Sequence, residues 1–238
     1  MKFFQSNSTS SWIVIFIAMT SLLMYSYLTS LLKRNMKITE PTMGNNVVAI
    51  YLQRLVGVVT FGVIPFLTVL FLDVSVLNGY GLIMSRPLKS LIWIISLTFI
   101  IVPICIYWGN TPVNLSIYPQ IRTNKWNLRI LVCSALSWTT YLFCYEFFFR
   151  GFLLFSCERG LGVQNAVIIN TLFYALAHFP KGKVETIGAI PFGLILCLAT
   201  FSTGSIWAAF GVHLVMALST EWISLYYHKE MKIILLRN

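Results

Sequence analysis

Long apolar stretches are the feature that most limits how this chain can fold. Seven of them are each close to the about 20 residues that a helix needs to cross a bilayer, and more polar segments separate most of them. They cover residues 12–32, 50–72, 90–108, 132–156, 163–179, 186–202 and 204–226. Only 10% of all residues are charged, against about 25% in soluble domains. The sequence therefore predicts an all-α fold, a polytopic transmembrane helical bundle with about seven spans.

The stretch 12–32 is predicted to be a retained span rather than a secretory signal. It is too long for a signal's apolar region and has no small-residue cleavage site, and its basic cluster (Lys33, Arg34 and Lys37) follows it. If that cluster is cytoplasmic, all but five of the 17 lysines and arginines fall on the same side. The five exceptions are Lys2, Arg86, Lys89, Arg150 and Arg159. By the positive-inside rule we expect an external N-terminus and a cytoplasmic C-terminus.

The formal net charge of +10 is assigned to loops that face anionic lipid. Membrane lipids are therefore expected partners, nucleic acid is not, and the expected location is the plasma (inner) membrane, as an integral multi-pass protein. The five cysteines lie in or beside apolar stretches and form no CxxC pair. They indicate neither a disulfide framework nor a zinc knuckle.

Ionisable residues inside the apolar stretches are concentrated in the second half of the chain. They are Glu146, Arg150, His178, His213 and Glu221. A charge at the centre of a bilayer costs from about 3 to more than 10 kcal/mol, so such residues usually line a site or a pathway. We therefore predict three parts: N-terminal transmembrane helices and loops at 1–129, a core that carries the chemistry at 130–226, and a cytoplasmic tail at 227–238.

These residues recur at a spacing of four, which places them on one face of a helix. Glu146 and Arg150 are four apart in YEFFFRGFLLF and are able to pair, either as a structural pair that docks two helices or as part of a site. Two later helices repeat the spacing, with Asn170, Tyr174 and His178 in one and His213, Ala217 and Glu221 in the other. Three helices that each bring a carboxylate or an imidazole into one bundle favour a site over packing alone.

Hydrolysis is the reaction that suits a glutamate with two histidines. A base must take a proton from water and a donor must stabilise the oxyanion that forms, and histidine can do either. Glu146, His178 and His213 are also candidate ligands for a divalent metal such as zinc. The sequence contains no HExxH motif, so it does not require a metal.

Three motifs in this region resemble those of a known family. The CAAX proteases and bacteriocin-processing enzymes are polytopic intramembrane proteases, which include the Ras-converting CAAX endopeptidase and the lysostaphin resistance protein A group. Their pattern is EExxxR, then FxxxH, then HxxxN, and the matching stretches here are YEFFFR (145–150), YALAH (174–178) and HLVMA (213–217). The resemblance covers about 130–225. Tyr145 stands in place of the first glutamate, and Ala217 in place of the asparagine.

The resemblance implies an intramembrane endopeptidase that cuts lipidated or membrane-associated polypeptides near the membrane surface. Glu146 would position or activate water, His178 would share the role of base, and His213 would donate to the oxyanion. Arg150 would hold Glu146. The residues expected to contact the peptide substrate are Tyr145, Tyr174 and Asn170.

Two alternatives remain open from the sequence. The replacements at Tyr145 and Ala217 are compatible with a proteolytically inactive relative that acts as a membrane binding or immunity scaffold. A proton-coupled transporter would use the same buried groups as a relay, although the sequence shows no inverted repeat. The length of a helix leads to a further expectation. The residues from Trp126 to about Ser134 are expected to form an interfacial helical turn, so that Glu146 lies level with His213.

Overall fold

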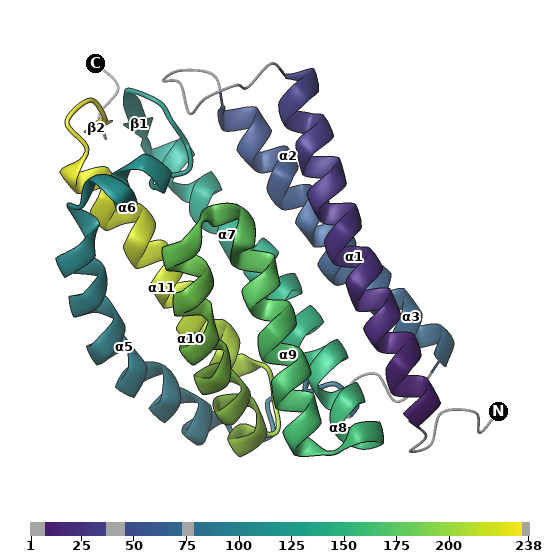
Figure 1. Cartoon of the computed structure of the whole chain (residues 1–238). Helices are drawn as coiled ribbons and strands as arrows, with labels where there is room; N and C mark the ends of the chain where they lie inside the picture. Colours follow the sequence, from purple (N-terminus) through teal and green to yellow (C-terminus); the bar gives the residue numbers. More distant parts are fainter. Residues whose placement is uncertain (1–7, 37–45, 73–78, 235–238) are drawn as a thin grey trace.

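The structure, a computed structural model, describes residues 8–36, 46–72 and 79–234 and is a bundle of helices (Figure 1). In chain order the helices are α1 (Ser8–Asn35), α2 (Val47–Val58), the π-helix η1 (Val59–Val63), α3 (Ile64–Leu72), α5 (Pro87–Gly109), α6 (Pro112–Ile117), α7 (Leu128–Glu146), the π-helix η2 (Phe147–Leu154), α8 (Phe155–Leu161), α9 (Val163–His178), the 3₁₀ turn η3 (Phe179–Lys181), α10 (Lys183–Thr203) and α11 (Trp207–Tyr227). Two short strands, β1 (Lys125–Asn127) and β2 (Lys232–Ile234), pair in parallel.

The helices account for seven passes through a membrane. Six stretches of the described residues are long and apolar enough to cross one, and the longest, Leu128–Lys181, has 54 residues. Within it Gly162 has a φ of 80°, a backbone conformation that glycine adopts without steric cost. The chain turns there, and α8 and α9 lie side by side (Figure 1). This stretch therefore holds two passes, and the predicted all-α bundle of about seven spans is confirmed.

Local signals in the sequence set the helix ends. Pro87 occupies the first turn of α5, where its missing N–H is not needed. The Asn127 side chain caps α7 by accepting a hydrogen bond from the Ile130 N–H at 2.9 Å. At the other end of a span, Gly204 ends α10 with a φ of 67°. These ends fix where each span enters and leaves the bundle.

The π-helix η2 runs through the middle of the bundle. Its residues Phe148, Phe149, Leu153 and Leu154 are fully buried, and the ring of Phe61 in η1 lies 5.0 Å from that of Phe148. The outer helices instead expose apolar side chains over much of their surface, as α5 does. The segment that carries Glu146 and Arg150 is therefore enclosed by protein, while the outer helices face the expected lipid.

One expectation from the sequence is wrong. Trp126 does not lie in an interfacial helical turn, because Lys125–Asn127 is strand β1 and helix α7 begins only at Leu128; pairing of Trp126 with Ile233 holds the strand. The charge count places Arg54 on the cytoplasmic side, and the predicted apolar stretch 50–72 includes it. Arg54 lies within the span Val47–Phe71 and is 4% exposed, because partners on neighbouring helices hold it.

The orientation in the membrane stays a prediction. We expect a reporter fused after Asn238 to be cytoplasmic and one placed before Met1 to be external, because most lysines and arginines then face the cytoplasm. Labelling of single engineered cysteines in intact cells measures this directly. External labelling of a cysteine placed beside Lys181, at the η3 turn between α9 and α10, would contradict the seven-span arrangement.

Candidate active site

A buried carboxylate joins two of the motifs. Glu146 is the last residue of α7 and is fully buried, and its Oε1 lies 2.5 Å from Nδ1 of His213 on α11. Its Oε2 lies 3.2 Å from Nη1 of Arg150. The Arg150 guanidinium also lies 4.3 Å from the ring centroid of Tyr174 on α9. One negative and one positive charge are thus buried together, and the expectation that Glu146 lies level with His213 is met.

The π-helix η2 forms the wall behind this carboxylate. The Asn170 side-chain amide donates a hydrogen bond of 2.6 Å to the Phe149 carbonyl inside η2, and its Oδ1 accepts one from Cys197 Sγ at 3.3 Å. Gly151 lies where a Cβ atom would come within 2.8 Å of the Tyr80 carbonyl. Such wide helical turns often occur at functional sites. Here the turn carries Arg150, whose guanidinium pairs with the Glu146 carboxylate four residues earlier in the chain.

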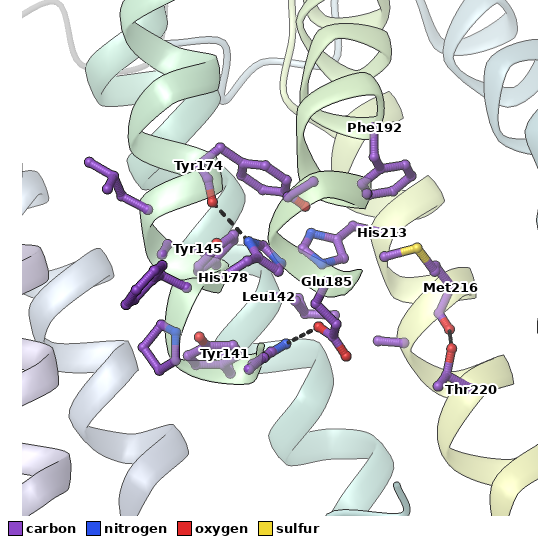
Figure 2. A pocket seen from close by; sticks show the side chains of 18 of the residues that line it. Tyr141, Leu142, Tyr145, Tyr174, His178, Glu185, Phe192, His213, Met216 and Thr220 are labelled. Carbon is purple, nitrogen blue, oxygen red and sulfur yellow. Dashed lines mark hydrogen bonds and ion pairs between the residues drawn. The ribbon is translucent and has the colours of Figure 1, made fainter. Parts of the chain in front are cut away.

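Both histidines line one cavity of about 960 Å³. Figure 2 shows His178 and His213 close together in this cavity, with Tyr145 beside them and Phe192 on the other side of His213. The ring centroid of Tyr145 lies 5.6 Å from that of His213 and 6.3 Å from that of His178. The Tyr145 ring therefore lies near both imidazoles. At this sequence position the family pattern has a glutamate.

The hydrogen bonds of the two imidazoles indicate which nitrogen carries the proton. His178 Nδ1 lies 2.8 Å from the Tyr174 carbonyl oxygen, which only accepts. His213 Nδ1 faces the Glu146 carboxylate in the same way. We therefore assign the Nδ1–H tautomer to both neutral rings. Each Nε2 then keeps a lone pair, and neither has a hydrogen-bond partner in the part of the chain that the structure describes.

The remaining predicted site residues divide into two groups. Tyr145, Tyr174, His178 and His213 line the cavity, whereas Glu146, Arg150 and Asn170 lie behind its wall. All three of the residues behind the wall are fully buried. The structure thus brings Glu146 to a histidine of the cavity rather than to the cavity itself.

The candidate metal ligands do not form a cluster in this geometry. Within residues 8–36, 46–72 and 79–234, no three His, Cys, Asp or Glu side chains are grouped so that they could hold a metal ion. Glu146 is bound to His213 and Arg150, and His178 is bound to a backbone carbonyl. We therefore assign no residue as a metal ligand.

Glu221 belongs to a second ionic cluster that the sequence reasoning missed. Its Oε1 lies 3.8 Å from Nη2 of Arg54 on α2, and both side chains are buried. Arg54 also lies over the ring of Trp138 on α7, 4.2 Å from its centroid. The signal that could have revealed the pair is electrostatic, because a buried cation in the second apolar stretch needs a buried anion elsewhere.

At one edge of the cavity the lining is polar. The Lys181 ammonium lies 3.4 Å from a Glu185 carboxylate oxygen and donates to the Tyr118 hydroxyl at 3.4 Å. Burial raises the pKa of Tyr118 to about 12, so this phenol stays protonated at neutral pH. Lys181 follows His178 by three residues, at the end of the η3 turn. The histidines therefore have apolar and aromatic walls on most sides and a charged edge on one.

The fold and the site together define a multi-pass integral membrane protein with a buried glutamate–histidine pair beside a cavity. The segment that carries this pair matches the model of a known protein family. Residues 126–219 match the family described as type II CAAX prenyl endopeptidase Rce1-like. This match supports the resemblance to the CAAX protease family over the segment that begins in β1 and ends within α11. No curated protein and no solved structure matches the chain.

Proposed function

We propose that the protein is an intramembrane endopeptidase that cuts membrane-associated or lipidated polypeptides. The hydrogen bond of 2.5 Å between Glu146 Oε1 and His213 Nδ1 in the wall of the cavity carries this proposal. A carboxylate that accepts from one imidazole nitrogen orients the ring and makes the other nitrogen a stronger base. The family match over residues 126–219 supports the same type of reaction.

In the proposed reaction, His213 Nε2 takes a proton from a water molecule. The water oxygen attacks the carbonyl carbon of a peptide bond, and the carbonyl oxygen becomes an oxyanion. The protonated imidazole then gives its proton to the leaving amine as the C–N bond breaks, which leaves a carboxyl group and an amine. Glu146 stabilises the positive imidazolium, and Arg150 holds the Glu146 side chain in place at 3.2 Å.

His178 and Tyr145 are assigned to the other side of the reacting water. His178 lines the same cavity, and we assign it a share of the role of base, as the family resemblance implies. A phenol has a reference pKa of about 10, so the Tyr145 hydroxyl is a hydrogen-bond donor at neutral pH. We assign it to the oxyanion, because its ring lies within 5.6 Å of His213 and within 6.3 Å of His178, centroid to centroid. In the sequence interpretation, His213 had that role.

The cavity wall fits a peptide with apolar side chains. Leu22, Phe61, Ile101, Phe192 and Met216 line it, from five different helical segments. A lining of this kind stabilises an apolar substrate by removing its surface from water. The substrate proposed here is accordingly a polypeptide held at the membrane, and not a water-soluble one.

A binding scaffold is the second candidate, and one observation favours it. Both oxygens of Glu146 already have partners and the residue does not line the cavity, while Tyr145 occupies the position of the family's first glutamate. Among the described residues that line the cavity, Glu185 alone carries a carboxylate, and it is paired with Lys181 at 3.4 Å. In this candidate the same cavity binds a polypeptide without cutting it.

Cleavage of a membrane-tethered peptide library by the purified protein in lipid separates the two candidates. We expect wild type to release defined fragments, identified by mass spectrometry and measured with and without chelator. Tyr145→Phe should slow cleavage by about 10- to 100-fold, because it removes one donor from the oxyanion. The phenylalanine ring of this variant keeps the ring contacts of Tyr145.

Two results would overturn the enzyme proposal. One is a wild-type protein without activity, alongside a Tyr145→Glu, Ala217→Asn double variant that cuts the same peptides; the scaffold candidate would then hold. The other is the absence of cleavage by every variant while the peptides still bind. Unchanged activity in Tyr145→Phe would remove only the oxyanion role of Tyr145.

A further inference from the structure

The buried pair Arg54–Glu221 lies apart from the proposed catalytic groups and holds a different part of the chain. That part is the connection 118–124 between α6 and β1, which we call the roof, because it lies at the end of the bundle where α6 and the β1–β2 pair are found (Figure 1). Glu221 Oε2 accepts a hydrogen bond of 3.1 Å from the backbone N–H of Gln120. Arg54 Nη2 donates to the side-chain oxygen of the same residue at 3.3 Å.

Arg54 connects the roof to two helices at once. Its Nη1 donates to Ser137 Oγ at 2.6 Å and to the Ser134 carbonyl at 3.1 Å, both on α7. The fork of a guanidinium offers five donors in a fixed geometry, which suits a position between several acceptors. Arg54 on α2 thus joins the roof to α7, while Glu221 joins it to α11.

A third residue fixes the roof from the start of α2. Both polar atoms of the Asn46 side chain are used: Nδ2 donates to the Gln120 carbonyl at 2.8 Å, and Oδ1 accepts from the Arg122 N–H at 2.7 Å. Two backbone N–H groups of this short connection are therefore bound by side chains rather than by secondary structure. A connection held in this way has one defined position over the bundle.

The roof reaches the cavity through Tyr118. This residue lines the cavity, is 8% exposed and accepts the hydrogen bond from Lys181, which follows His178 by three residues. Tyr118 also packs against Trp138, and the Arg54 guanidinium lies over the Trp138 ring. The position of the roof therefore determines the polar edge of the cavity beside a proposed catalytic histidine.

We infer that Arg54 and Glu221 are positioning residues that fix the roof and, through Tyr118 and Lys181, shape the entrance by which a polypeptide reaches His178. The pair touches neither histidine, so its loss changes substrate binding more than the chemical step. The effect on substrate binding rests on the proposed function. The effect on the roof does not.

Hydrogen exchange measured by mass spectrometry on the full-length protein in lipid tests the effect on the roof. The test variant is Arg54→Met, Glu221→Leu, because replacing both members of a buried pair by apolar residues is often neutral for stability. We expect the amides of residues 118–124 to exchange about tenfold faster than in wild type, since the Gln120 N–H loses its acceptor. Asn46→Ala, which removes the other support, should produce the same local change.

A control and an activity measurement complete the test. Ser116→Ala removes a hydroxyl that bonds only the nearby Val113 carbonyl and is exposed, and it should leave roof exchange unchanged. In the cleavage assay the double variant should show a KM raised by about three- to tenfold and a kcat within about twofold of wild type.

The exchange result decides the inference. Roof amides that exchange at the wild-type rate in both the double variant and Asn46→Ala would overturn it, whatever the activity. Faster exchange of the roof amides together with a lower kcat and an unchanged KM would also overturn the inference, because the pair would then act on the chemical step. If wild type cuts no peptide, exchange still tests the roof, while the proposed function fails separately.

Discussion

Glu146→Gln and His213→Ala are each expected to slow peptide hydrolysis by about 100- to 10,000-fold, the range that losing a general base typically costs. The double variant should be no slower than the slower single variant. The reason is the hydrogen bond between the two side chains: once His213 is absent, the Glu146 carboxylate has no imidazole to orient. When two side chains act as one catalytic unit, removing either one removes the contribution of both.

Initial rates on a peptide identified in the cleavage assay provide the measurement. Glu158→Gln is the matched control, because it makes the same chemical change in α8, away from the residues that line the cavity. It should retain activity within about twofold of wild type. Additive losses in the Glu146→Gln, His213→Ala double variant would contradict a single catalytic unit, and activity that survives His213→Ala unchanged would remove His213 from the mechanism.

Arg150→Leu is expected to destabilise the protein by about 3–5 kcal/mol, the usual cost of leaving one member of a buried ion pair alone. Arg150 and Glu146 are both fully buried, and the Glu146 carboxylate would keep only His213 as a partner. Adding Glu146→Gln to Arg150→Leu should recover part of this loss, since no buried charge is then left unpaired. The order of stability should be wild type, then the double variant, then Arg150→Leu.

Denaturant titration in detergent micelles, followed by tryptophan fluorescence, measures the loss. The exposed cation Arg129 at the start of α7 offers the control. Arg129→Leu should change the free energy of unfolding by no more than about 0.5 kcal/mol. An Arg150→Leu variant as stable as Arg129→Leu would show that the Glu146–Arg150 pair does not hold the bundle together.

The transmembrane helices and the main site could be predicted from the sequence because both depend on local patterns. Apolar length alone located the seven passes, and most predicted ends lie within about four residues of the observed ones. The spacing of four placed Glu146 beside Arg150 on one helix, and the order of the motifs indicated that His178 and His213 share a cavity. These inferences needed no knowledge of how distant segments pack.

Other features depend on contacts between segments far apart in the chain. Strand β1 forms because its residues meet β2, more than 100 positions later, so nothing near Trp126 indicated it. The buried contacts of Arg54 were not predictable because its acceptors lie on α7 and in the roof, far away in the sequence. Nothing near Asn170 in the sequence indicated that its side-chain amide is bound to the Phe149 carbonyl. Its contact with substrate stays a prediction.

The wide turns of η2 also determine which side of the following helix meets α1. In a regular α-helix each residue rotates about 100° around the axis, and a π-helical turn takes in an extra residue, so every later side chain is displaced around the axis relative to a continuous α-helix. Downstream of η2, Cys157 is fully buried and the Ser156 carbonyl accepts a hydrogen bond from Ser11 at 2.8 Å. A helical wheel drawn without a break from α7 would assign the wrong contact face to α8.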